Sequence, residues 1–214
     1  MQRQQSTLTY VAIPVTNSIQ TDLISTFPTG TFQPKHGTST FSIPSSPDTC
    51  GYADNGPCNF YDGFGFSGSG TSITIDAKVS SPVKAYTLMN AYQPTSGAQV
   101  ATIEFVGDGG ATVTYPLIGG EDIRDFYEHI WANTLNNGVS GVVARNAFQC
   151  DDPHTCLGAG GTGNVNTGGA GKYRVDEQQY SLRPLHRQAL TQIVITDTAN
   201  GMSPILLGLT VESN

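Results

Sequence analysis

The feature that most constrains this fold is a β-hairpin signal in the middle of the chain. Gln99–Val106 alternates between polar and apolar residues, Asp108-Gly109 lies in a turn, and Ala111–Ile118 alternates back. Strict alternation is the period of a half-buried strand, and Asp-Gly tolerates the positive φ angles of a tight hairpin turn. Of the two faces of the first strand, the apolar one should face the core; it carries Ala101, Ile103 and Phe105.

The same two-residue period recurs along most of the chain and predicts an all-β fold of about ten short strands. We expect an antiparallel β-sandwich or jelly roll with minimal helix. Only Ile123–Trp131 and Leu185–Leu190 have room for one or two helical turns. The further expected strands are Tyr10–Val15, Thr38–Ile43, Thr71–Ile75, Val83–Tyr92, Val139–Phe148, Lys172–Leu182, Ala189–Thr196 and Pro204–Val211.

The 214 residues are expected to form a single domain, since no linker divides the chain. Residues 1–82 would supply N-terminal strands and a cysteine loop, and the N-terminal segment would complete or cover a sheet edge. Residues 83–212 would supply the rest of the sandwich.

The charge balance excludes two classes of partner. Charged residues make up 13% of the chain, and its net charge is −7 with ten Lys and Arg in total. Binding to nucleic acid or to an anionic membrane surface needs clustered cations, so neither is expected. No apolar run approaches the roughly 20 residues of a membrane span.

The four cysteines form two close pairs, each around a polar, Pro-containing loop. We expect the disulfides Cys50–Cys58 and Cys150–Cys156, although the spacing leaves free thiols and a metal site open. Disulfides indicate an oxidising compartment, and hence a secreted or cell-surface protein. The first residues lack the apolar stretch of a signal peptide. We therefore expect a mature chain whose leader was removed, the alternative being a cytoplasmic protein with reduced thiols.

Acidic residues and arginines occur together in two segments. Asp122 and Asp125 flank Arg124, and Asp176 and Glu177 closely follow Arg174. Glycosidases use two carboxylates across a cleft, which is one interpretation. The other is a network of Arg–carboxylate pairs that pins strands or a loop, and we favour it because an adjacent cation makes a carboxyl group a poorer acid.

A cluster of aromatic residues suggests a sugar-binding loop. Tyr127, His129 and Trp131 lie close together in a polar segment, and Trp131 is the only tryptophan. Aromatic faces bind the apolar face of a pyranose, while polar groups bind its hydroxyls. Core packing is the competing interpretation for Trp131. If the loop is a site, we expect Arg124, Asp125 and Asp176 to contribute to ligand binding.

A structural calcium ion is a further hypothesis. Hard cations prefer carboxylate and carbonyl oxygens. Asp48, Asp54 and Asp62 lie in and around the first cysteine loop. Asx turns that cap the loop are the alternative.

Four stretches together resemble a β-sandwich module of exported bacterial proteins, many of which carry a PEP-CTERM sorting signal. They are Tyr86–Tyr92, Ala101–Phe105, Tyr115–Tyr127 and Tyr173–Leu182. This module is similar in outline to galactose-binding-like and NPCBM-type carbohydrate-binding domains. The resemblance covers roughly residues 83–212 and implies export, a sandwich fold and, loosely, a carbohydrate ligand. The sorting signal itself does not follow Val211 in this sequence.

The leading functional expectation is a secreted, non-catalytic binding module for extracellular polysaccharide. One alternative is a structural subunit of an extracellular matrix or filament that self-associates through its Thr-rich segment Met1–Pro47. Another is a polysaccharide hydrolase or lyase, in which Asp122, Asp125, Asp176 and Glu177 would supply the acids.

Overall fold

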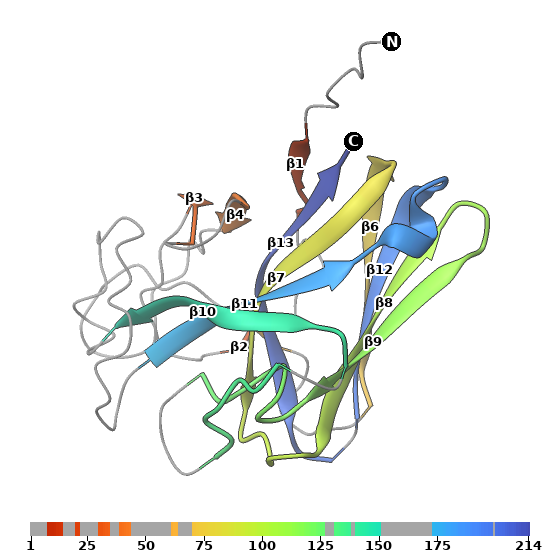
Figure 1. Cartoon of the computed structure of the whole chain (residues 1–214). Helices are drawn as coiled ribbons and strands as arrows, with labels where there is room; N and C mark the ends of the chain where they lie inside the picture. The colour runs from red at the N-terminus through yellow and green to blue at the C-terminus, as the bar shows by residue number, and fades with distance from the viewer. Residues whose placement is uncertain are drawn as a thin grey trace.

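The computed structural model describes residues 8–14, 20–21, 30–34, 39–43, 61–63, 70–126, 131–137, 140–150, 173–198 and 200–214. These residues form an antiparallel β-sandwich of two packed sheets, which confirms the expected fold class (Figure 1). In this part of the chain the only helical element is the 3-10 turn Arg183–Leu185. No helix within the described ranges is long and apolar enough to cross a membrane.

The larger sheet has seven strands. Six of them lie in the order β10-β11-β7-β13-β5-β2. The seventh, β1, pairs with the C-terminal end of β13, past the part of β13 that pairs with β5. The longest strands of this sheet are therefore flanked on both sides. The bounds are β1 Thr9–Ala12, β2 Gln20–Thr21, β5 Tyr61–Gly63, β7 Pro82–Tyr92, β10 Val143–Cys150, β11 Tyr173–Ser181 and β13 Ser203–Ser213.

The smaller sheet has four strands in the order β6-β12-β8-β9, with bounds β6 Ser72–Ser80, β8 Gln99–Gly107, β9 Thr112–Ile118 and β12 Ala189–Asp197. The expected hairpin is β8–β9, paired from Gln99–Ile118 to Val106–Thr112. In β6 every second side chain is buried, which is the pattern of a strand with one face on the core and one in solvent.

The main core lies between the two sheets. Ala101, Ile103 and Phe105 are fully buried in it, while Thr102 and Glu104 on the opposite face are half-buried. The predicted facing of this strand is therefore confirmed. Phe105 contacts the ring of Tyr180 from the larger sheet, with centroids 5.4 Å apart.

A second apolar layer covers the other face of the larger sheet. The hairpin formed by β3 (Gly30–Phe32) and β4 (Phe41–Ile43) contributes Phe32 and Phe41, which cluster with Tyr86 and Leu88 of β7. Gly208 permits this close packing, because a Cβ there would meet the Phe41 side chain at 3.2 Å. β7 is consequently buried on both faces.

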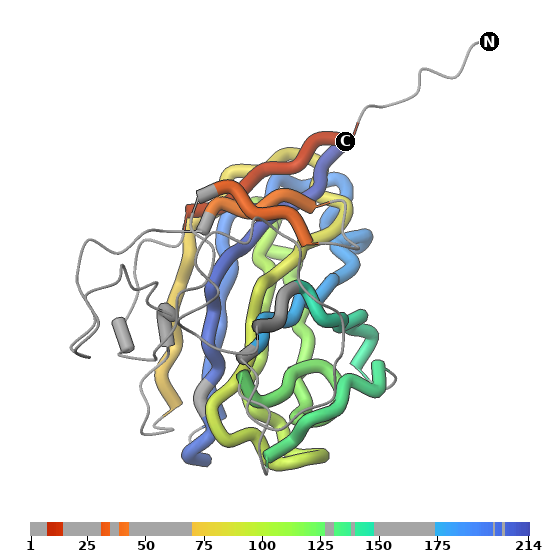
Figure 2. The backbone as a smooth tube through the Cα atoms, turned by 90° about the vertical axis from the view of Figure 1, so that its left-hand side faces the viewer, coloured from red at the N-terminus to blue at the C-terminus, as the bar shows by residue number. Residues whose placement is uncertain are grey.

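Three loops gather at the end of the sandwich opposite the chain termini (Figure 2). The β7–β8 loop joins the segment after β9 through hydrogen bonds between Gly97 and Gly119 (2.8 Å) and between Gly119 and Ala98 (2.9 Å). Gly119 has no room for a side chain, because a Cβ would lie 2.3 Å from the Thr95 carbonyl oxygen. The Thr95 amide in turn donates to the Met202 sulfur (3.0 Å), which attaches the β12–β13 loop.

Three details differ from expectation or refine it. Residues 123–126 are extended rather than helical, since their backbone groups bond to β7 and β11. The N-terminal segment completes the larger sheet as expected, through β1. β6 precedes residue 83 and is still a full member of the smaller sheet, so the sandwich begins before the region that carries the family resemblance.

Candidate functional site

The candidate site is built where strands β7 and β11 separate. They pair from Lys84–Ser181 as far as Leu88–Glu177, and then diverge. The segment that follows β9 enters the gap. The amide of Ala91 donates to the carbonyl of Arg124 (3.0 Å), the amide of Phe126 donates to the carbonyl of Ala91 (3.1 Å), and the amide of Arg174 donates to the carbonyl of Phe126 (2.9 Å). This segment therefore acts as a short inserted strand.

Asn90 closes the part of the gap that the inserted segment does not reach. Its Oδ1 accepts the backbone amide of Asp176 (3.0 Å), and its Nδ2 donates to Asp176 Oδ2 (2.8 Å). The side chain thus replaces a neighbouring strand, which explains a fully buried asparagine inside an otherwise apolar stretch of β7.

Arg124 and Asp176 form a two-pronged ion pair across the gap. Arg124 Nε donates to Asp176 Oδ2 (2.8 Å) and Nη2 donates to Oδ1 (2.7 Å). The Asp176 side chain is 0% exposed and that of Arg124 is 14% exposed. Of the two interpretations of these segments, this ion pair fits the one in which arginines and carboxylates form a network that holds strands and loop together. The partner acid comes from a distant strand rather than from the neighbours of Arg124 in sequence.

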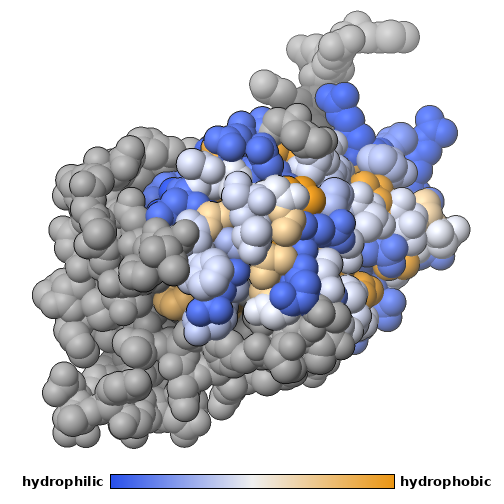
Figure 3. Space-filling model, turned by 90° about the horizontal axis from the view of Figure 1, so that it is seen from below, coloured by the Kyte–Doolittle hydropathy of each residue, from blue (hydrophilic) through white to orange (hydrophobic). Residues whose placement is uncertain are grey.

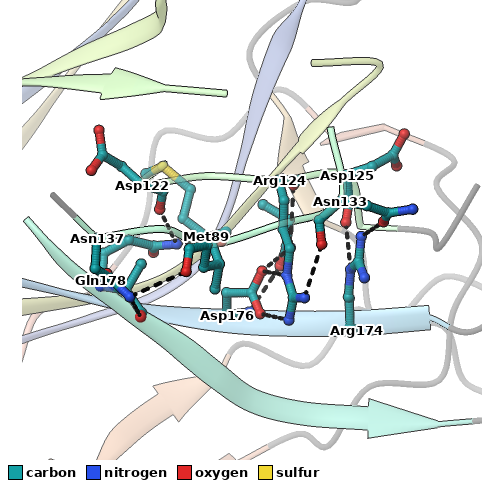
Figure 4. Close-up of polar contacts among 12 residues, drawn as sticks. Met89, Asp122, Arg124, Asp125, Asn133, Asn137, Arg174, Asp176 and Gln178 are labelled. Atoms are coloured by element: carbon teal, nitrogen blue, oxygen red, sulfur yellow. Dashed lines mark hydrogen bonds and ion pairs between the residues drawn. The ribbon is translucent and has the colours of Figure 1, made fainter. Parts of the chain in front are cut away.

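Arg174 makes the reciprocal connection. Figure 4 shows Arg124 reaching from the inserted segment to β11, and Arg174 reaching from β11 back to the loop. Arg174 Nε donates to the carbonyl of Asp125 (2.8 Å), and Nη2 donates to Asn133 Oδ1. Arg124 Nη1 also donates to the carbonyl of Asn133 (3.3 Å). Both guanidinium groups therefore hold the segment that contains residues 131–137.

A buried amide extends the network along β11. Gln178 Nε2 donates to the carbonyls of Met89 (2.9 Å) and Asp122 (3.3 Å), and its Oε1 accepts from the Thr87 hydroxyl (2.8 Å). The Thr87 hydroxyl also lies 3.1 Å from that of Tyr180, whose pKa is raised by burial. Every polar atom of the Gln178 side chain is thus used in fixing strands and loop.

Asp122 is a fully buried carboxyl group that stabilises the turn after β9. Its Oδ2 accepts the amide of Ile118 (2.9 Å) and its Oδ1 accepts the hydroxyl of Ser140 (2.6 Å). Burial raises its pKa, and these two hydrogen bonds oppose the rise only in part. The role of Asp122 is therefore structural: it holds the turn after β9 against Ser140.

Glu177 points to the opposite face of the larger sheet. It accepts a hydrogen bond from Ser39 (2.6 Å) and pairs with Arg145 of β10. The four acids singled out in the sequence are therefore not gathered around one cleft. None of Asp122, Asp125, Asp176 and Glu177 is more than 3% exposed.

Trp131 lies at the loop end of the sandwich and is half-buried. The next residue, Ala132, donates its amide to the carbonyl of Pro94 (2.9 Å) and accepts the amide of Asp125 (3.0 Å). Trp131 is thereby attached to both the β7–β8 loop and the inserted segment. Tyr127 and His129 lie outside the described residues.

The expected disulfides and calcium ligands fall almost wholly outside the described part of the chain. Cys50, Cys58, Cys156, Asp48 and Asp54 lie there. Cys150 and Asp62 belong to β10 and β5, and only their backbone is described. Both hypotheses therefore stay predictions.

No family model, curated protein or solved structure matches this chain at a significant level. The resemblance to exported bacterial sandwich modules accordingly stays an expectation from sequence.

Sequence reasoning missed the residues that complete the network, which are Asn90, Asn133, Asn137, Ser140 and Gln178. The available signal was a polar residue inside an otherwise buried strand, as Asn90 and Gln178 are, because buried amides need several partners. Nothing local distinguishes Asn133 or Ser140 from ordinary loop residues.

We predict that Asp176→Asn lowers the free energy of unfolding by about 3 kcal/mol, because it removes the carboxylate opposite a largely buried guanidinium. Chemical denaturation measures the loss. The double variant Arg124→Met/Asp176→Asn should lose less than the two single variants combined, since the charge is then removed with its partner. Equal stability of Asp176→Asn and wild type would show that the pair does not hold the segment.

A second prediction concerns pH. The raised pKa of Asp122 favours its neutral form in the folded state, so its contribution to stability is complete below the unfolded pKa of about 3.9 and is lost as pH rises through the folded value. Asp122→Asn should match wild type near pH 3 and become the more stable protein towards pH 7. Ser140→Ala should steepen the wild-type loss, because it removes a hydrogen bond that lowers this pKa. Parallel stability curves for wild type and Asp122→Asn would contradict this account.

Proposed function

We propose that this protein is a non-catalytic binding module for extracellular polysaccharide, and that the loop end around Trp131 contacts the sugar. The observation that carries the proposal is the composition of this end. Residues 93–98, 131–137 and 200–202 of this end contain no Asp, Glu, Lys or Arg. They contain the single tryptophan among amide and hydroxyl side chains. Those of Asn133, Asn137 and Asn200 bond other parts of the chain, and the remaining ones are Gln93, Thr95, Ser96, Thr134 and Asn136. The adjoining segment after β9 adds Glu121, a half-buried acid whose Oε1 accepts a hydrogen bond from Asn136 Nδ2 (3.3 Å).

Such a surface suits an uncharged, hydroxyl-rich ligand. An aromatic face covers the apolar side of a sugar ring, and amides offer both donors and acceptors to its hydroxyls. Viewed from below, hydrophilic and near-neutral residues predominate over the described surface, and strongly apolar residues are scattered (Figure 3). An apolar partner would need a contiguous apolar patch.

The buried network supports binding by preparing the loop in advance. The segment that begins at Trp131 is held through Asn133 by two arginines and through Ala132 by two backbone hydrogen bonds. A loop ordered before the ligand arrives loses less conformational entropy on binding.

The same network favours binding over hydrolysis. A general acid must come within hydrogen-bond reach of the bond that breaks. Asp176 is occupied by Arg124 and Asn90, and Glu177 by Ser39 and Arg145, with both side chains at most 1% exposed. The hydrolase alternative therefore has no exposed carboxylate among the four acids it proposed.

The sheet edges bear on the alternative of a self-associating subunit. At β10, the Asn137 side chain bonds both the amide and the carbonyl (2.8 Å) of Ala144, as a neighbouring strand would. β9 carries Pro116 within its length, and the exposed face of β6 carries Asp76 and Lys78. Such features oppose pairing with another chain. β1 is already paired with β13 of the same chain, which further favours the binding module.

We expect Trp131→Ala to weaken polysaccharide binding by tenfold or more, since loss of the aromatic face removes the stacking surface. A glycan array identifies the ligand, and affinity is then measured by calorimetry. Because Trp131 is the only tryptophan, quenching of its fluorescence reports directly on this loop.

Trp131→Phe is the matched variant and should retain part of the affinity, as it keeps an aromatic ring. The melting temperature of each variant must be measured alongside. Wild-type affinity in a folded Trp131→Ala protein would contradict the assignment of the site. A dimer or filament that appears in light scattering at higher concentration, without glycan binding, would favour the subunit.

A further inference from the structure

Three residues other than glycine adopt positive φ angles in the described part of the chain: Ser81 (49°), Gln93 (51°) and Asn137 (52°). An L-residue pays a steric penalty in this region, and such positions persist where the surroundings or the function require them. Each of the three therefore calls for a reason.

Two of them have structural reasons. Ser81 is the single residue between β6 of the smaller sheet and β7 of the larger, so the chain must reverse and change sheets within one residue. Its carbonyl also accepts the amide of Asn214 (3.2 Å). Asn137 uses its amide to cover the edge of β10 at Ala144, and asparagine tolerates this backbone region better than most residues.

Gln93 has no comparable reason. It follows β7 directly and is half-buried, and its side chain makes one long hydrogen bond in the described structure, from Nε2 to the Tyr92 hydroxyl (3.3 Å). No hydrogen bond of its Oε1 is found among the described residues. Glycine at this position would remove the steric strain of the positive φ angle, yet the residue has a long polar side chain.

The position of Gln93 suggests what this side chain is for. The adjacent Pro94 carbonyl accepts the amide of Ala132, so the main chains of Gln93–Pro94 and Trp131–Ala132 lie side by side. On the other side, Tyr92 stacks against Phe126 with ring centroids 6.3 Å apart and an interplanar angle of 23°. Gln93 thus directly follows Tyr92 in the chain, and its other neighbour, Pro94, is bonded to the residue after Trp131.

We propose that Gln93 is a ligand-contact residue for an uncharged sugar ring bound beside Trp131. The inference rests on the proposed function and adds a polar contact to it. A primary amide presents one acceptor and two donors, so Oε1 accepts from one hydroxyl of the sugar while Nε2 donates to an adjacent one. A site built on such bonds rejects ligands that lack the hydroxyl, which gives Gln93 a role in specificity.

Gln93→Gly separates this role from a structural one. It relieves the strained backbone, so the melting temperature should stay equal or rise by about 2–4 °C, while affinity for the polysaccharide falls about tenfold. The probes are soluble neutral glucan, xylan, mannan and galactan, with anionic alginate and polygalacturonate as charged comparisons. Gln93→Ala, which keeps the strain but removes the amide, should lose the same affinity.

Ser81→Gly is the matched control. It relieves the same kind of strain at the other end of β7 and should leave affinity unchanged. Tyr92→Phe tests whether Gln93 acts only by holding the Tyr92 hydroxyl, and should retain most of the affinity.

The outcomes distinguish this inference from the proposed function. Loss of binding in Trp131→Ala with wild-type affinity in Gln93→Gly and Gln93→Ala overturns the role of Gln93 and leaves the proposed function standing. Equal loss in Tyr92→Phe and Gln93→Gly overturns direct contact in favour of positioning. Absence of wild-type binding to every polysaccharide overturns both proposals.

Discussion

The structure depends on how buried backbone groups are satisfied where β7 and β11 separate. Buried amides and carbonyls without partners are costly, so the gap between these two central strands has to be filled with hydrogen-bonding groups. The inserted segment provides backbone hydrogen-bond partners for Ala91 of β7 and Arg174 of β11. The Asn90 side chain provides the partner for the backbone amide of Asp176. The charged groups that cross the gap follow from this arrangement, because Arg124 and Asp176 are brought together only once the segment is in place.

Rigidity at the loop end is the functional consequence. A loop that carries a tryptophan and many amides would ordinarily be mobile. Here Arg124 and Arg174 fix Asn133 from two sides, and Gly119 lets the β7–β8 loop approach closely enough to bond with the segment after β9. A polar surface with few charged groups is thus presented on a rigid support, which is the arrangement that the proposed recognition of a neutral sugar favours.

Local pattern and long-range pairing differ in how far the sequence reveals them. The alternation of β8 and the Asp108-Gly109 turn are local, so strand, hairpin and facing were predictable and are confirmed. The partner of Arg124 was not predictable, because Asp176 lies 52 positions away and meets it only through the register of β7 and β11. Glu177 follows Asp176 directly and faces the other side of the sheet, since side chains alternate along a strand. Two adjacent acids therefore belong to separate networks, which composition cannot show.

The central claim is that the loop end is anchored as firmly as the sheets, and amide hydrogen exchange tests it most directly. The amides of Asp125, Phe126, Ala132 and Arg174 all donate to backbone carbonyls across the gap or between loops. The account predicts that they exchange as slowly as amides in the centre of β8, close to the rate of global unfolding. Exchange at the rate of an unprotected amide would contradict it, because the Trp131 loop would then open independently of the sandwich.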